Sequence, residues 1–158
     1  MKLSKSREKY LLQKHFNTKS EKNIPNFLSQ FGCRDSDTSD EDLFFITQYV
    51  TAVEMVVLGG SLLTETGLRY LKNLQEVKHL DLRSLPLNKS NLQSILHFKN
   101  LEYLDVKNTQ ISAQEITVIL ENFKFLKTFR IDVPSENEAD FELWKKQYPN
   151  CELIINLI

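Results

Sequence analysis

The sequence is short of the residues that build disulfide scaffolds, flexible linkers and membrane spans. Its 158 residues include only two cysteines, four glycines and four prolines. Cys33 and Cys151 stand far apart without a CxxC partner, so neither a disulfide framework nor a cysteine zinc site is indicated. No apolar run is long enough to span a bilayer, and the few glycines and prolines argue against long linkers. We therefore expect a compact, reduced, cytoplasmic protein.

An excess of charge of one sign and the usual catalytic motifs are also missing. The formal net charge is −1, which gives no general reason to expect binding to nucleic acid or to an anionic membrane. The sequence contains no glycine-rich phosphate loop, no nucleophile elbow and no HExxH motif. His15, His79 and His97 share no metal-ligand spacing with each other or with a cysteine. We expect neither a cofactor nor an enzyme.

The sequence does contain an apolar pattern that repeats at intervals of 24 or 25 residues. The clearest copy is LEYLDVKNTQI, residues 101–111, with apolar residues at Leu101, Leu104, Val106 and Ile111. The other copies place apolar residues at Val53, Val56, Leu58 and Leu63; at Val77, Leu80, Leu82 and Leu87; at Leu126, Phe129 and Ile131; and, in a truncated copy, at Cys151 and Ile154. A period of this length indicates a repeat array.

Each copy combines a strand pattern with a helix pattern. Leu104 and Val106 alternate about Asp105, so a short strand turns the two apolar side chains to one face and Asp105 to the other. After each strand, apolar residues take helical spacing at Leu68, Leu71 and Leu74; Leu92, Ile95 and Leu96; Ile116, Ile119, Leu120 and Phe123; and Phe141, Trp144 and Tyr148. One strand and one helix cannot bury their apolar faces alone, but stacked copies share a continuous core.

The pattern L-x-x-L-x-L, followed by a polar and then an apolar residue, resembles the leucine-rich repeat family over roughly residues 40–158. It is more similar to the short intracellular repeats of bacterial or ribonuclease-inhibitor-like type than to extracellular ones. The resemblance implies an α/β solenoid of about four repeats with a parallel concave sheet and convex helices. Family members usually carry Asn, Cys or Thr where this chain has Ser61, Leu85, Thr109 and Pro134, so we expect only a partial side-chain ladder there. The resemblance implies protein binding rather than catalysis.

Residues 1–38 form a separate N-terminal segment in our prediction, and residues 39–158 form the repeat domain. A basic amphipathic helix is predicted near the start, with Tyr10, Leu11, Leu12 and Phe16 along its apolar side. A second short helical stretch is predicted at residues 26–31, followed by an acidic linker at residues 33–42. We interpret these helices as a cap over the open end of the array, and binding to a membrane surface is the alternative.

A polar sequence before residue 43 predicts the start of a further helix. Ser39 and Asp42 have the spacing of a capping box. In this motif the Ser39 side chain bonds to the backbone N–H of residue 42, and the Asp42 side chain bonds to the backbone N–H of residue 39. The helix over residues 43–50 is then expected to begin the array. A phosphorylation site at Thr38 or Ser39 is the competing interpretation, because acidic residues follow each of them at the third position.

Three columns of side chains are predicted to face out of the concave sheet, two, four and six positions after the first residue of each copy. They are Met55, His79, Tyr103, Thr128 and Leu153; Val57, Asp81, Asp105, Arg130 and Ile155; and Gly59, Arg83, Lys107, Asp132 and Leu157. The predicted partner-binding residues are His79, Asp81, Arg83, Tyr103, Asp105, Lys107, Thr128, Arg130 and Asp132. We expect Asp81 and Asp105 to be neighbours in a solvated mosaic of ion pairs around an aromatic centre.

These columns favour a non-catalytic module that binds another protein, as an adaptor or assembly factor or as an inhibitor of a partner enzyme or toxin, of the immunity type. An enzyme that uses the Asp81 and Asp105 carboxylate pair is the alternative. The apolar residues at the two ends of the face raise a further question. We expect the N-terminal helices to cover the first end, and self-association through the C-terminal strand is one option for the second.

Overall fold

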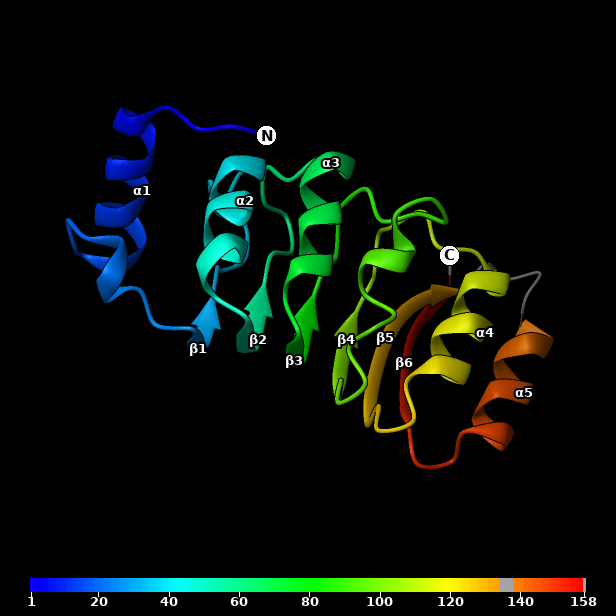
Figure 1. Ribbon diagram of the computed structural model, residues 1–158. Coiled ribbons are helices and arrows are strands. Elements are labelled where there is room, and N and C mark those ends of the chain that lie inside the picture. Colours follow the sequence, from blue (N-terminus) through cyan, green and yellow to red (C-terminus); the bar gives the residue numbers. More distant parts are fainter. Residues whose placement is uncertain (134–137, 158) are drawn as a thin grey trace.

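The computed structural model describes residues 1–133 and 138–157. Its architecture is α/β, and six parallel strands form one sheet in the order in which they occur in the chain (Figure 1). The strands are β1 (Phe27–Phe31), β2 (Ala52–Val57), β3 (Glu76–Asp81), β4 (Tyr103–Asp105), β5 (Thr128–Val133) and β6 (Glu152–Leu157). The predicted α/β class with a parallel sheet is thereby confirmed.

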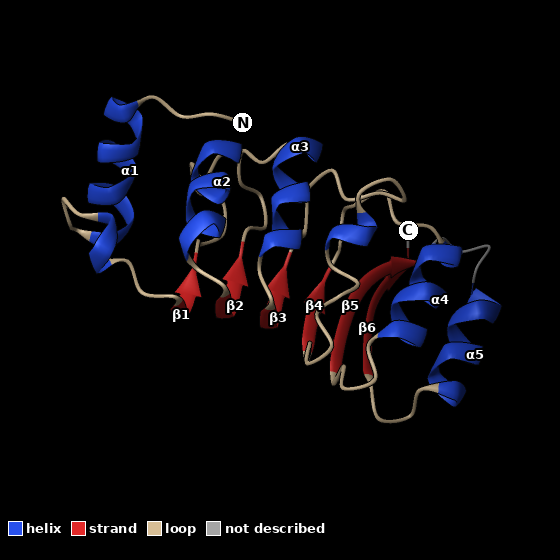
Figure 2. Ribbon diagram, viewed as in Figure 1, coloured by secondary structure: helices blue, strands red, loops and turns tan. Residues whose placement is uncertain are grey.

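The helices lie along one side of the row of strands (Figure 2). They are α1 (Lys5–Phe16), α2 (Asp40–Tyr49), α3 (Glu65–Leu68), α4 (Ala113–Asn122) and α5 (Glu138–Gln147), with shorter 3-10 turns η1 (Glu21–Asn23), η2 (Arg69–Asn73) and η3 (Leu92–Ser94). The connections between successive parallel strands therefore run over the same face of the sheet. The opposite face of the sheet, which we call the open face, carries the strand side chains that point away from the helices.

The core lies between the strands and these helices. The strand register pairs Val53 with Val77 and aligns Leu80, Leu104 and Phe129 across three strands. All five side chains are buried in one continuous apolar cluster. Each large side chain buried in this way contributes roughly 2 kcal/mol of hydrophobic stabilisation relative to exposure. The repeated apolar pattern of the sequence is therefore the pattern that fills the core.

The connection between β3 and β4 is less helical than its apolar spacing predicts. Only the short turn η3 forms there, because asparagine side chains bond to nearby backbone groups and compete with a helix. Asn91 Nδ2 donates to the Pro86 carbonyl at 2.8 Å, and Asn91 Oδ1 accepts from the Asn88 amide at 2.9 Å. Leu92 and Ile95 are nevertheless buried, so the spacing predicts burial correctly.

The predicted helix at residues 26–31 is wrong, because this stretch forms β1. Leu28 and Phe31 pair with Val53 and Val56 of β2, and Phe31 is buried in the core while Phe27 is exposed. Because the segment pairs with β2, its backbone N–H and C=O groups form their hydrogen bonds within the sheet. The sheet therefore extends into the N-terminal segment and crosses the boundary that we placed between residues 38 and 39.

The last strand is displaced by one residue from its predicted register. Glu152 and Ile154 pair with Thr128 and Arg130, whereas Leu153 and Ile155 pair with Phe129 and Ile131 and pack against the core. The apolar columns predicted on the open face at this end are therefore wrong for Leu153 and Ile155. A shift of one residue exchanges the two faces of a strand, and this register packs the two partly buried apolar side chains against the core.

The polar column expected to form a partial ladder is irregular. Thr109 Oγ1 donates to the Val106 carbonyl at 2.6 Å, within its own repeat. The Ser61 hydroxyl oxygen is buried and has no hydrogen-bond partner among the described residues, and Leu85 is apolar and buried. Pro134 lies outside the described residues.

In residues 1–133 and 138–157, no helix has the length and apolar character needed to cross a bilayer.

Helix α1 packs beside α2 at the N-terminal end of the sheet (Figure 1). Leu11 and Leu12 form a buried apolar cluster with Phe45 of α2. Tyr10, which we predicted on the same apolar side, is exposed instead, and the Arg7 guanidinium lies 4.8 Å from the centre of its ring. The predicted amphipathic helix is therefore present, with a narrower apolar stripe than the sequence indicates.

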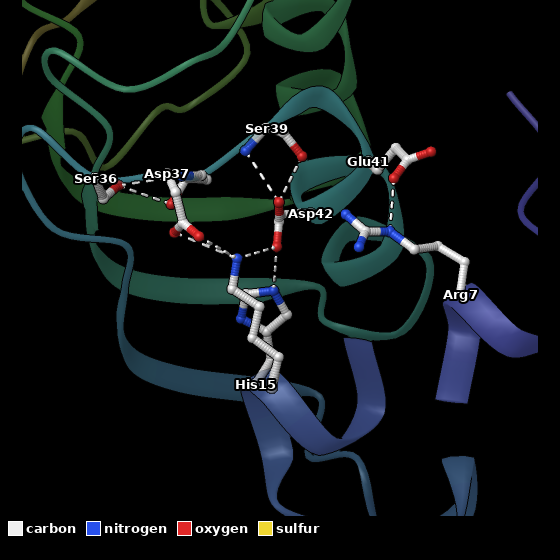
Figure 3. Close-up of polar contacts among 9 residues, drawn as sticks. Arg7, His15, Ser36, Asp37, Ser39, Glu41 and Asp42 are labelled. Atoms are coloured by element: carbon white, nitrogen blue, oxygen red, sulfur yellow. Dashed lines mark hydrogen bonds and ion pairs between the residues drawn. The ribbon is translucent and has the colours of Figure 1, made fainter. Parts of the chain in front are cut away.

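A buried carboxylate joins α1 to the start of α2 (Figure 3). Asp42 Oδ1 lies 2.7 Å from His15 Nε2 and 2.9 Å from Lys14 Nζ, both on α1. Asp42 Oδ2 accepts from the Ser39 amide at 3.0 Å, and the two side chains complete the predicted capping box. Burial acts to raise the pKa of Asp42, but hydrogen bonds from His15, Ser39 and Lys14 outweigh it and hold the pKa well below its usual value.

Candidate interaction face

The open face brings together the side chains that the repeat period predicts to be neighbours. The register aligns Met55, His79, Tyr103 and Thr128 in one row across β2 to β5. The next row aligns Val57, Asp81, Asp105 and Arg130. Asp81 and Asp105 are the last residues of β3 and β4, so the two carboxylates lie at the carboxyl-terminal end of the sheet. The predicted adjacency of Asp81, Asp105 and Arg130 is confirmed.

The two carboxylates are buried rather than solvated. Only 4% of Asp81 and none of Asp105 is exposed. Arg34, from the loop after β1, places Nε 2.6 Å from Asp81 Oδ2 and Nη2 3.9 Å from Asp105 Oδ2. Arg130 Nε lies 3.6 Å from the same Asp105 oxygen. The predicted solvated mosaic is therefore wrong at its centre, where two arginines lie against buried carboxylates.

Backbone groups fix the orientation of both carboxylates. Asp81 Oδ1 accepts from the Arg83 amide at 3.2 Å, and Asp105 Oδ1 accepts from the Lys107 amide at 3.1 Å. The backbone at residue 59 lies close to the first of these turns. A Cβ atom at this position would stand only 2.6 Å from Asp81 Oδ1. Gly59 therefore leaves the room that Asp81 occupies. Backbone amides, rather than the Arg83 and Lys107 side chains, make the close contacts to the carboxylates.

Burial and the neighbouring charges together shift the pKa values of this cluster. Burial raises the pKa of Asp105, the negative charge of Asp81 adds to that increase, and the Lys107 amide and the Arg130 guanidinium oppose it. A hydrogen bond to Asp81 raises the pKa of Arg34, and contact with the Tyr103 hydroxyl raises the pKa of Arg130. The two guanidinium groups thus remain positively charged throughout the physiological range.

The remaining predicted residues surround this cluster. Thr128 is partly exposed beside Tyr103, and Asp132 accepts a hydrogen bond from the Asn108 amide. The side chains of Arg83 and Lys107 are partly exposed and form no ion pair with any described residue. Asp132 Oδ1 is buried without a hydrogen-bond partner among those residues. All nine predicted residues therefore lie on strands β3 to β5 or in the turns directly after them.

A depression in the open face lies next to the charged cluster. It has a volume of about 420 Å³ and crosses β1 to β4, with an apolar floor that includes Met55 and Val57. His79 and Tyr103 line it together, with their ring centres 6.0 Å apart. Arg34 and Asp81 close its charged end. The expectation that N-terminal helices cover Met55 and Val57 is wrong, because both line this depression and remain partly exposed.

Sequence reasoning missed Arg34 and Gln30, which belong to the same face. Both follow from aligning Leu28 with Val53, which places Gln30 beside Met55 and Arg34 in the column of Gly59, Arg83 and Lys107. The signal is present in the 25-residue interval between Leu28 and Val53. It was hidden because Phe27, Leu28 and Phe31 also fit helical spacing.

The arrangement is suited to recognition by shape and charge. A rigid parallel sheet holds an apolar, aromatic-lined depression beside fixed ion pairs, a combination that is typical of a protein-binding surface.

Among the described residues, no group of three or more His, Cys, Asp and Glu side chains is placed to hold a metal ion. No protein-family model matches the sequence, and no curated protein matches it.

Proposed function

We propose that this chain is a leucine-rich-repeat-type solenoid that binds another protein through its open face. The 24- and 25-residue period, the sequential order of six parallel strands and the placement of the helices on one side support the solenoid. On this proposal the open face is the concave face, and α1 caps the N-terminal end through Leu11, Leu12 and Phe45.

The depression lined by Met55, His79 and Tyr103 is the observation that carries the binding proposal. Aromatic and methionine side chains on a rigid sheet anchor a complex when the partner covers them and removes water from their surface. The surrounding charges then set the orientation and specificity of the complex. A cytoplasmic adaptor, an assembly factor and an immunity-type inhibitor all use such a surface.

An enzyme that uses the Asp81 and Asp105 pair is the second candidate. The raised pKa of Asp105 favours it, because a carboxyl group with a raised pKa beside a second carboxylate is typical of a catalytic acid. The burial of Asp105 and the ion pair between Arg34 and Asp81 weigh against it. Neither carboxylate is free to approach a substrate, so we prefer binding.

A comparison of two double variants tests the proposed function. Truncation of His79 and Tyr103 to alanine is expected to remove a stoichiometric partner from an affinity pull-down in the native lysate, because both anchors of the depression are lost. Val118→Ala with Leu143→Ala is the matched control, since these exposed apolar residues lie on α4 and α5. Mass spectrometry identifies the partner. Retention of the same partner by the His79 and Tyr103 variant would contradict binding through the open face.

A further inference from the structure

Four basic side chains cluster at the carboxyl-terminal end of the open face. They are Arg34, Arg83, Lys107 and Arg130, contributed by the turns after β1, β3 and β4 and by β5 itself. The acidic residues between them, Asp81 and Asp105, are almost completely buried. A partner that approaches this face therefore meets cations, while the compensating carboxylates lie beneath them.

The buried carboxylates hold two of these cations in place. Arg34 and Arg130 each turn the Nε atom toward a carboxylate, and 42% and 32% of their side chains remain exposed. A guanidinium has five donors in a fixed plane, and the contacts of Arg34 with Asp81 and Asp105 and of Arg130 with Asp105 and Tyr103 use only part of them. Because the arginines are already ordered, they lose less conformational entropy when they bind an anion.

The other two basic residues are positioned through their backbone amides rather than by an ion pair with a described residue. Arg83 and Lys107 make no ion pair with a described residue, although their backbone amides are bonded to Asp81 and Asp105. Their charges are therefore not neutralised by direct pairing. Together with Arg34 and Arg130 they make up what we call the basic arc, at the carboxyl-terminal end of strands β1 to β5, and Arg34 links this arc to the depression that it lines.

Two carboxylates that are not fully buried also lie on the open face, on its last two strands. Asp132 and Glu152 lie over β5 and β6, where Glu152 is exposed beside Thr128. The open face thus carries cations at the turns after β1, β3 and β4 and at Arg130 of β5, and partly or fully exposed carboxylates at Asp132 of β5 and Glu152 of β6. This distribution sets a direction for any partner that carries charges of both signs.

We propose that the partner segment recognised by this face is acidic and carries one apolar side chain, which enters the depression while neighbouring carboxylates bind the basic arc. This inference rests on the proposed function and specifies its partner chemistry. A carboxylate suits the planar donors of Arg34 and Arg130, and the apolar floor at Met55 and Val57 requires a side chain without charge. Nucleic acid is less favoured, because the whole chain carries a formal net charge of −1. Its bases stack on exposed aromatic rings, so the test below includes it as the competing ligand.

The test is a selection of random linear peptides on the immobilised full-length chain. Enriched peptides are expected to combine an aromatic or aliphatic residue with nearby Asp or Glu. Binding of a selected peptide should weaken about tenfold in Arg83→Gln with Lys107→Gln, and should weaken further as salt is added. Neither side chain has an ion pair among the described residues, so this variant is expected to fold.

Lys124→Gln with Lys146→Gln is the control, because it removes the same charge from exposed positions in the turn after α4 and on α5 and should leave binding unchanged. Failure to enrich any peptide, enrichment without acidic residues, or tighter binding of single-stranded RNA than of the peptides would overturn the inference. Binding that depends on Tyr103 but not on Arg83 and Lys107 would overturn it while leaving the proposed function in place. Partner binding that is independent of both would remove the proposed function as well.

Discussion

Replacement of Asp42 by alanine is expected to lower the free energy of unfolding by about 3 kcal/mol. The substitution removes the Asp42 carboxylate, which makes one of the two contacts of the α2 capping box. It also leaves Lys14 and His15 of α1 without the buried carboxylate that they contact. Because Asp42 is 1% exposed, water does not replace these contacts in the folded protein. Urea unfolding followed by circular dichroism measures the change.

Two comparisons separate this effect from a general loss of surface charge. Asp37→Ala, at an exposed carboxylate that also pairs with Lys14, should change the stability by no more than about 0.5 kcal/mol. The folded-state pKa of Asp42 is depressed, so its stabilisation is present above the unfolded pKa of about 4 and is lost as the pH falls below it. The difference between wild type and variant should therefore shrink in acid. A difference that is constant down to pH 3 would contradict the role assigned to this carboxylate.

Phe31→Ala is expected to cost about 3 kcal/mol, because it empties a core position on β1. Phe31 is 5% exposed and packs in the main apolar cluster, and its ring lies 5.7 Å from the ring of His15. The matched variant Phe27→Ala, at the other end of the same strand, should change the stability by less than about 0.5 kcal/mol, since Phe27 is 52% exposed. Chemical unfolding of both variants gives the comparison.

This pair tests the different burial of the two ends of β1, which neither a regular helix nor a strictly alternating strand would produce. In a helix, residues 27 and 31 share one face and are expected to respond alike. In the strand, Phe31 pairs with Val56 in the core while Phe27 lies at the exposed start of β1. Similar losses from both variants would contradict this pairing and burial of β1.

The central strands were predictable because their apolar residues occur on one face only. In β3 and β4, Leu80 and Leu104 alternate with charged or polar neighbours, so the register follows directly from the sequence. At β6 the sequence ELIINL is apolar at consecutive positions, and the pattern does not determine which residues face the core. Cys151 was taken as the first residue of the copy because it is apolar, and the register was displaced by one residue as a result.

The candidate site was predictable in its membership but not in its electrostatics. The period places Asp81, Asp105 and Arg130 side by side, as the structure does. Whether the carboxylates are solvated depends on what covers them, and Arg34 reaches them from a loop 47 residues before Asp81. The depression depends in the same way on Gln30 and Arg34, which enter the face only once β1 is recognised as a strand.

Site-specific photocrosslinking tests the central claim, that the open face is the binding surface, most directly. A photoreactive phenylalanine derivative is placed at position 79 on the open face, or at position 118 or 143 on α4 or α5, and each protein is irradiated in the native lysate. Binding through the open face predicts one discrete crosslinked partner from position 79 and none from the two helix positions. A partner crosslinked from position 118 or 143, with position 79 silent, would contradict it.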